Sequence, residues 1–296
     1  MMSPTRKSYI YAGLAIFFWS TVPTAFKISL GEMDILSMLT IATLSSTAVL
    51  TIALFSGRKT VQLMKTTGRE LLKSAILGLI NPFIYYLILL RAYQLLPAQV
   101  AQPLNMIWPV IIVFLSVPIL RQKIAGRSYL ALLISFVGVY IIASQGKPFT
   151  ASHSDLKGVF LATGSSLFWA VYFLMNVKDK RDETVKLLLN FIFGSIYLIA
   201  AMIITGNFHS VPGLKGVAAS VYIGIFEMGI TFLFWLRALQ MATTTDKVSN
   251  LVYLAPFLSL VFVHFIIHEP VYYTTPAGLL LIIIGILIQN RKPAAT

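Results

Sequence analysis

The polar chemistry of this chain centres on one carboxyl group, Glu227, which stands inside the long apolar segment 216–238. The other nine Asp and Glu residues fall in predicted loops or near predicted helix ends. A charge at the centre of a bilayer costs about 2.5–3.5 kcal/mol even on a lenient scale, so this carboxyl should face a cavity or a polar partner. There it could carry a proton or bind an amine. The alternative is that neighbouring hydroxyl groups bind it and that it only locks helices together.

An amide group stands at the matching place of a second apolar segment. Residues 78–94 read GLINPFIYYLILLRAYQ and residues 224–240 read GIFEMGITFLFWLRALQ, and the two are identical at seven positions without a gap. In this register Asn81 lies opposite Glu227. Pro82 removes a backbone donor beside Asn81, which either frees a carbonyl group for a substrate or simply kinks the helix. We therefore expect a doubled scaffold in which only one copy can titrate.

Further polar and aromatic side chains stand inside the predicted helices. Tyr85 shares a helical face with Asn81. Amide groups at lipid depth must face protein or water, and aromatic rings can stack on another ring or on an ammonium group. The alternatives are hydrogen bonds between helices, at about 0.6 kcal/mol each, and ordinary packing. The predicted substrate contacts are Asn81, Tyr85, Asn105, Trp108, Asn250 and Tyr253.

The sequence carries no signature of an enzyme or of a metal protein. It has no Cys, which excludes disulfides, thiolate nucleophiles and Cys metal sites. It has no Gly-rich phosphate loop ending in Lys and Ser or Thr, no HExxH and no GxSxG. We therefore expect no catalytic residue, no metal site and no cofactor.

The composition predicts the elements that position these residues. Hydrophobic residues make up 57% of the 296 residues and charged residues 11%, with a mean hydropathy of +0.83, whereas soluble domains carry roughly 25% charged residues. The class is therefore all-α integral membrane protein, because the apolar runs are continuous rather than alternating as in barrel strands. The ten predicted membrane helices cover residues 8–27, 34–55, 71–93, 99–120, 128–145, 156–176, 186–205, 216–238, 247–267 and 275–290.

The distribution of Lys and Arg predicts the orientation of these helices. With the N-terminus in the cytoplasm, 18 of the 23 basic residues fall on the cytoplasmic side and 5 on the other. Cytoplasmic loops are the ones enriched in Lys and Arg, so both termini are predicted to be cytoplasmic. The net charge of +13 is then an orientation signal and does not indicate a nucleic-acid partner.

The chain reads as two five-helix halves, residues 1–148 and 155–296. Trp19 of the first predicted helix matches Trp169 of the sixth, and Gly138 of the fifth matches Gly285 of the tenth. Because five is an odd number, the second half must enter the membrane from the opposite side. Inverted repeats of this kind are typical of secondary transporters, with the substrate site near the midplane between the repeats.

Three stretches resemble a known family. The FFWSTVP start of residues 17–23, the repeat itself and the HEPVYYTTPAGLLLIIIGILI ending of residues 268–288 resemble the drug/metabolite transporter superfamily, in its EamA branch. Members of that branch often carry a Glu before the last helix of each half, which Glu269 matches, whereas Gln122 stands at that place in the first half. Residues 105–123, NMIWPVIIVFLSVPILRQK, resemble the bacterial aromatic amino-acid exporters.

Together these features predict a secondary active transporter. We expect it to export a small metabolite, such as an amino acid or a related amine, by alternating access coupled to protons at Glu227. Uptake by the same fold stays open, since gradients set the direction, and so does a lipid scramblase or a membrane-embedded enzyme. The expected location is a bacterial-type inner (plasma) membrane. The expected partners are the lipid bilayer and the small-molecule substrate, with the chain acting as a monomer.

Overall fold

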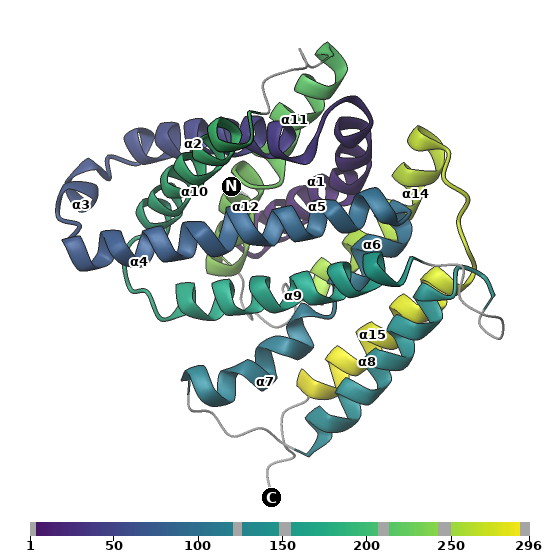
Figure 1. The fold of residues 1–296 in the computed structure, drawn as a ribbon. Helices are drawn as coiled ribbons and strands as arrows, with labels where there is room; N and C mark the ends of the chain where they lie inside the picture. Colours follow the sequence, from purple (N-terminus) through teal and green to yellow (C-terminus); the bar gives the residue numbers. More distant parts are fainter. Residues whose placement is uncertain (1–3, 121–125, 148–154, 207–212, 242–249, 291–296) are drawn as a thin grey trace, which may run out of the picture. The chain divides into compact units, whose positions relative to one another are not determined.

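The fold is helical throughout the described part of the chain (Figure 1). The computed structural model describes residues 4–120, 126–147, 155–206, 213–241 and 250–290, and within these residues it contains no strand. The elements in chain order are α1 (Pro4–Glu32), α2 (Ile35–Ser56), α3 (Thr60–Met64), α4 (Gly68–Gly78), the π-helix η1 (Leu79–Ile84), α5 (Tyr85–Leu95), α6 (Ala98–Asn105), α7 (Trp108–Leu120), α8 (Arg127–Ala143), α9 (Leu156–Val177), α10 (Glu183–Thr205), α11 (Leu214–Phe226), α12 (Ile230–Met241), the 3-10 helix η2 (Asn250–Tyr253), α14 (Leu254–Ile267) and α15 (Thr274–Asn290).

Several of these helices are long and apolar enough to cross a membrane. Six qualify by length and composition within the described residues, namely Arg6–Glu32, Ile35–Ser56, Gly68–Leu95, Leu156–Val177, Glu183–Thr205 and Leu214–Trp235. Shorter apolar helices cover Tyr129–Ala143, Leu251–Ile267 and Thr274–Ile288. The all-helical, multi-pass membrane class predicted from the composition is therefore confirmed.

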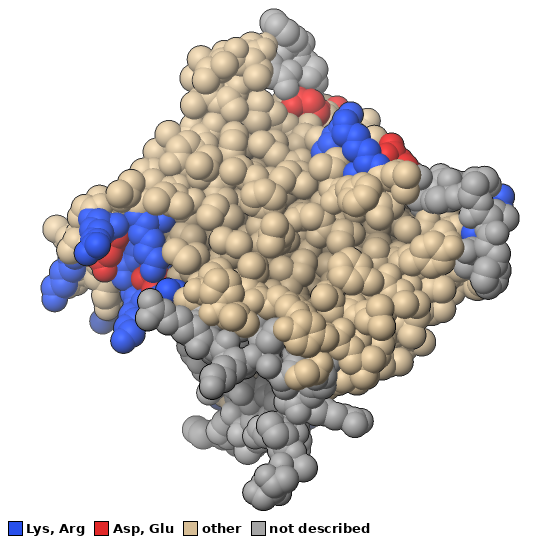
Figure 2. Space-filling model, turned by 60° about the horizontal axis from the view of Figure 1, so that its bottom comes forward, with Lys and Arg blue, Asp and Glu red and all other residues tan. Residues whose placement is uncertain are grey.

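Acidic residues cap helix ends, as expected for charges kept out of the apolar segments. The Asp34 carboxylate accepts the N–H groups of Leu36 and Ser37 at the start of α2. Thr67 and Glu70 form a capping box at the start of α4. These caps satisfy backbone donors that the helix itself leaves free. On the face shown in Figure 2, charged side chains gather in separate patches and a broad expanse between them carries none, which suits contact with lipid.

The helices form two compact units, each assembled from two separate stretches of chain. Unit 1 comprises Met1–Leu90 and Lys180–His268, and unit 2 comprises Arg91–Asp179 and Glu269–Thr296. Each of the two halves predicted from the sequence therefore contributes helices to both units. Packing within each unit joins segments that are far apart in the chain.

Unit 1 is held together by close helix approaches. In it α1 packs against α11, α12 and α14, α2 packs against α10 and α11, and α10 packs against α4 and η1. Two glycines allow the closest approaches: Gly78 lies against the backbone of Asn190 in α10, and Gly224 lies against the backbone of Ala42 in α2. A side chain at either glycine would overlap a carbonyl oxygen. Small residues at helix contacts are what close packing in membranes requires.

Unit 2 is built on one long helix pair and one broken helix. The helices α8 and α15 run side by side (Figure 1). A Cβ added at Gly138 would lie 2.6 Å from the Gly278 carbonyl oxygen, and one at Gly285 would lie 2.8 Å from that of Ala131. The second contact group is α9 with α6 and α7. The helices α6 and α7 together cover the predicted span 99–120, which is therefore two helices rather than one.

Candidate functional site

The third predicted membrane helix is interrupted at Asn81. The backbone of Asn81 leaves helical geometry, with φ −147° and ψ 120°, inside the π-helix η1 between α4 and α5. Pro82, which follows it, carries no N–H and cannot continue the helical ladder. The side chain of Asn81 is 2% exposed, and among the described residues its Oδ1 has no hydrogen-bond partner. A buried acceptor of this kind is suited to a ligand or a water molecule.

The eighth predicted membrane helix is interrupted at Glu227. The helix α11 ends at Phe226 and α12 begins at Ile230, so three residues between them lie outside both helices. In the ungapped register of the sequence repeat, Glu227 stands where Asn81 stands. Both copies of the repeat therefore break their helix at the same place, and each break carries a polar side chain. Broken helices at membrane depth are tolerated where they are buried in protein or line a cavity.

A hydrogen bond joins the Glu227 break to α5. The Tyr86 hydroxyl donates to the Glu227 Oε1 over 3.0 Å. Tyr86 is 1% exposed, and its ring meets the rings of Phe26 and Tyr85 edge-on, with centroid distances of 6.4 and 4.7 Å. The carboxyl group thus has one phenol donor in an aromatic surrounding. It can exchange a proton or receive an ammonium group, and aromatic faces add attraction for a cation.

The helix α1 lies against the last turn of α11, next to Glu227. The ring of Phe18 stacks on that of Phe226 with centroids 4.3 Å apart. The Thr21 and Tyr222 hydroxyls lie 2.6 Å apart and share a hydrogen bond. This contact positions the end of α11 just before the chain leaves the helix. The α1 residues near Trp19, singled out by the repeat, therefore do belong to the surroundings of the break.

The remaining residues predicted in this part of the chain lie at the start of the ninth predicted helix. Tyr253 ends η2 and is half-buried. Asn250 begins η2, and its side chain is outside the described residues. Within the part of unit 1 that the structure describes, no hydrogen bond joins Tyr253 to Glu227. A shared site for these residues stays a prediction.

Asn105 and Trp108 belong to a second polar cluster, in unit 2. The Asn105 Nδ2 donates to the Ser165 hydroxyl over 2.8 Å, which ties the end of α6 to α9. The Trp108 ring lies 6.1 Å from that of Phe173 in the same helix α9. Both contacts join one helix to another. The sequence leaves open whether these residues contact substrate or join helices, and these contacts are of the second kind.

Tyr86 is the functional candidate that the sequence prediction missed. Counting a regular helix from Asn81 places Tyr85 on the same face. A π-helical turn closes over five residues instead of four, so the break displaces that position by one residue. The pair Asn81 and Pro82 was the available signal that the count would fail there.

No metal centre is suggested by the acidic and His residues. Among the described residues, no group of three or more His, Cys, Asp or Glu side chains could hold a metal ion. The site chemistry available in this part of the chain is therefore that of one carboxyl group with hydroxyl, amide and aromatic neighbours.

Sequence comparison assigns the chain to a family. Residues 6–144 and, again, residues 156–291 match the EamA-like transporter family. The chain belongs to that family. The resemblance to the EamA branch of the drug/metabolite transporters is thereby confirmed.

Several proteins of similar sequence are named as transporters. An uncharacterized transporter of Clostridium kluyveri is 27% identical over 97% of this chain and 95% of its own length. One from Archaeoglobus fulgidus is 23% identical over 97% and 99%. The UDP-galactose/UDP-glucose transporter 4 of Arabidopsis thaliana is 25% identical over 67% of this chain and 59% of its own length. A crystal structure at 19% identity has a TM-score of 0.66 over 97% of both chains, which shows a shared fold.

Glu269, the acid that the resemblance singled out before the last helix, has a structural contact. The Glu269 carboxylate accepts the Ala98 N–H, at 2.8 and 3.2 Å from its two oxygens, at the start of α6. Beside it the buried Gln99 donates to the Pro270 carbonyl and accepts the Tyr272 N–H over 3.0 Å. These bonds fasten the segment before α15 to α6. The matching Gln122 lies outside the described residues.

Proposed function

We propose that this EamA-family transporter exports a small metabolite, such as an amino acid or a related amine, by proton-coupled alternating access. The observation that carries the proposal is Glu227, an acid in a membrane helix that is broken at its position and is bonded to Tyr86. A carboxyl group can hold a proton or a substrate ammonium group, and one site that takes either in turn couples the two flows.

We propose further that the scaffold is a ten-helix inverted repeat with both termini in the cytoplasm. Recurring contacts support it. The first and ninth predicted helices pack together as α1 with α14, and their repeat equivalents pack as α9 with α6 and α7. The third and seventh pack as α4 with α10, and their equivalents pack as α11 with α2. Because the two halves insert in opposite directions, a site between them could open to either side of the membrane, as alternating access requires.

The proposed substrate class follows from the groups near Glu227. The carboxyl supplies a counter-charge for an ammonium group, and the aromatic rings of Tyr86 and Phe226 supply apolar area beside it. Asn81, with a buried acceptor oxygen, is the second proposed contact, together with Tyr85. This set favours a small amphipathic cation or zwitterion over a large anion. We also propose an inner-membrane location and a single chain as the working unit.

The test is transport by the purified full chain in proteoliposomes. A thermal-shift screen of amines and amino acids identifies a ligand, and counterflow with that ligand establishes transport. An imposed pH gradient should then drive accumulation by the wild type. Glu227→Gln removes the titrating group with little change in shape and should abolish the gradient-driven part.

Glu70→Gln is the matched control. Glu70 is a partly exposed acid in the capping box with Thr67, and Gln can occupy the same capping position. This variant should accumulate substrate as the wild type does. Accumulation by Glu227→Gln at the wild-type level would remove the coupling role of Glu227. Sidedness of the inserted protein, read by protease protection, relates the measured direction to export or uptake.

A further inference from the structure

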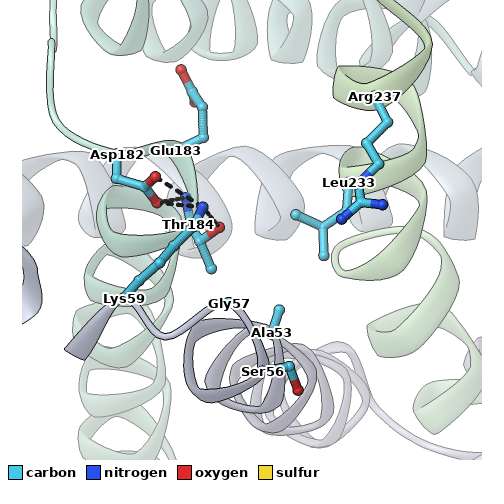
Figure 3. A pocket seen from close by; sticks show the side chains of 9 residues that line it. All are labelled: Ala53, Ser56, Gly57, Lys59, Asp182, Glu183, Thr184, Leu233 and Arg237. Atoms are coloured by element: carbon cyan, nitrogen blue, oxygen red, sulfur yellow. Dashed lines mark hydrogen bonds and ion pairs between the residues drawn. The ribbon is translucent and has the colours of Figure 1, made fainter. Parts of the chain in front are cut away.

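A pocket lies in unit 1 between the ends of two helices and the side of a third. It has a volume of about 330 Å³ and lies between the C-terminal end of α2, the start of α10 and the helix α12. Figure 3 shows Lys59, Asp182 and Thr184 grouped on one side of it, Arg237 with Leu233 on the other, and Ala53 with Ser56 below. A space of this volume is enough for a small organic molecule.

Two of the charges on the α10 side are already neutralised. The Lys59 Nζ lies 2.8 Å from the Asp182 Oδ2 and donates to the Thr184 hydroxyl over 3.0 Å. Asp182 also caps α10 by accepting the N–H groups of Thr184 and Val185. Burial alone would raise the pKa of Asp182, but the hydrogen bond and charge of Lys59 and these N–H groups hold the pKa below its ordinary value.

The second acid at the pocket is neutralised as well. The Glu183 Oε1 lies 2.8 Å from the Nζ of Lys186, a buried side chain of the same helix. In Figure 3 the Glu183 side chain points away from the Lys59–Asp182 pair. Among the described residues, the start of α10 therefore offers no unpaired carboxylate to this pocket.

Arg237 is the remaining charged residue of the pocket lining. It lies on α12, is exposed and lines the pocket one turn after Leu233. Within the described residues, no carboxylate lies within ion-pair distance of its guanidinium group. In the part of the chain that the structure describes, the lining thus combines one cation that has no carboxylate partner with the apolar side chains of Leu233 and Ala53. A guanidinium group presents two parallel N–H donors in the geometry of a carboxylate.

We propose that this pocket is a binding site for small organic monocarboxylates, with Arg237 holding the carboxylate group. The apolar part of the ligand lies over Leu233 and Ala53. The one positive charge of the lining that lacks a carboxylate partner among the described residues matches one negative charge. A dianion such as inorganic phosphate would meet the nearby carboxylates of Asp182 and Glu183. The site does not involve Glu227, so this proposal and the transport proposal can fail separately.

Calorimetric titration of the purified full chain in detergent tests the site. The probes are butyrate, butylamine and inorganic phosphate, which separate charge sign and charge number. The wild type should bind butyrate saturably and bind the other two much more weakly. Arg237→Gln should weaken butyrate binding about 10- to 100-fold, the range expected when a charge-assisted hydrogen-bonded pair is lost.

Two further variants complete the design. Arg91→Gln changes the repeat equivalent of Arg237, which donates to Gln94 over 2.6 Å and does not line the pocket, so butyrate binding should be unchanged. Ala53→Phe fills the pocket without changing its charge and should abolish butyrate binding. Absence of butyrate binding by the wild type, tighter binding of phosphate or butylamine, or equal losses in Arg237→Gln and Arg91→Gln would each overturn the proposal. Circular dichroism confirms that each variant is folded.

Discussion

The hydrogen bond between Tyr86 and Glu227 can be measured by a double-mutant cycle. Tyr86→Phe deletes one hydroxyl and keeps the ring that packs against Phe26 and Tyr85. Glu227→Leu deletes the acceptor. Each variant alone also changes burial and solvation, and Glu227→Leu removes a carboxyl that is costly in lipid. Only the coupling between the two changes isolates the bond.

The expected coupling is about 1–1.7 kcal/mol. Hydrogen bonds to charged groups contribute about 1.5–3 kcal/mol in proteins, while cycles in membrane proteins average about 0.6 and reach about 1.7 kcal/mol. The upper part of the membrane range applies because the donor–acceptor distance is 3.0 Å and Tyr86 is 1% exposed, so water cannot easily replace the lost partner.

The assay is reversible unfolding in mixed micelles, with the free energy of unfolding compared among wild type, both single variants and the double variant. Tyr197→Phe combined with Glu227→Leu is the control cycle, because the Tyr197 hydroxyl donates to the Ala75 carbonyl instead. The control should be additive within about 0.5 kcal/mol. A coupling no larger than that of the control would refute the proposed bond and with it the position of Glu227.

Close packing, one cap and one buried amide each lead to a further prediction. Gly224→Ala should lower the unfolding free energy by about 1–3 kcal/mol, because its Cβ would overlap the backbone of α2. Gly164→Ala is the control and should not destabilise the protein, because a Cβ there would have no atom within 4 Å. Thermal denaturation compares the two variants. Asp182 has a lowered pKa, so its stabilisation is present above its ordinary pKa of about 3.9 and is lost as the pH falls through the lowered value. Asp182→Asn should flatten that acid limb of the stability curve, and an unchanged limb would contradict the assignment. Gln99→Leu leaves the Tyr272 N–H without its acceptor and should cost about 1–3 kcal/mol, measured by chemical denaturation; a neutral effect would show that water replaces the amide.

The helices themselves could be predicted from the sequence because apolar length is a strong signal. Of the breaks within them, only the one at Asn81 was indicated in advance, by Pro82. The segments 99–120 and 216–238 are each apolar enough to read as one helix, yet the first divides into α6 and α7 and the second into α11 and α12. Hydropathy is an average over residue types, so it has the same value whether the backbone of an apolar segment is continuous or broken.

The candidate site was predicted in part. Glu227 and Asn81 were predicted because a charge or an amide at membrane depth is costly. Both lie at helix breaks, and their role stays a prediction. Tyr86 was missed because the π-helical turn shifts the helical count by one residue. The two compact units could not be predicted either. Each joins stretches from both predicted halves through long-range packing, which local sequence patterns do not indicate.

Release of protons on ligand binding would measure the role of Glu227. The full chain, in weakly buffered detergent solution, is mixed with the amine or amino acid identified by the thermal-shift screen, and a pH indicator follows the solution. If substrate and proton compete for Glu227, the wild type and Glu70→Gln should release protons on binding, and Glu227→Gln should release none. Equal release from Glu227→Gln, or binding by the wild type without release, would contradict coupling at this carboxyl group.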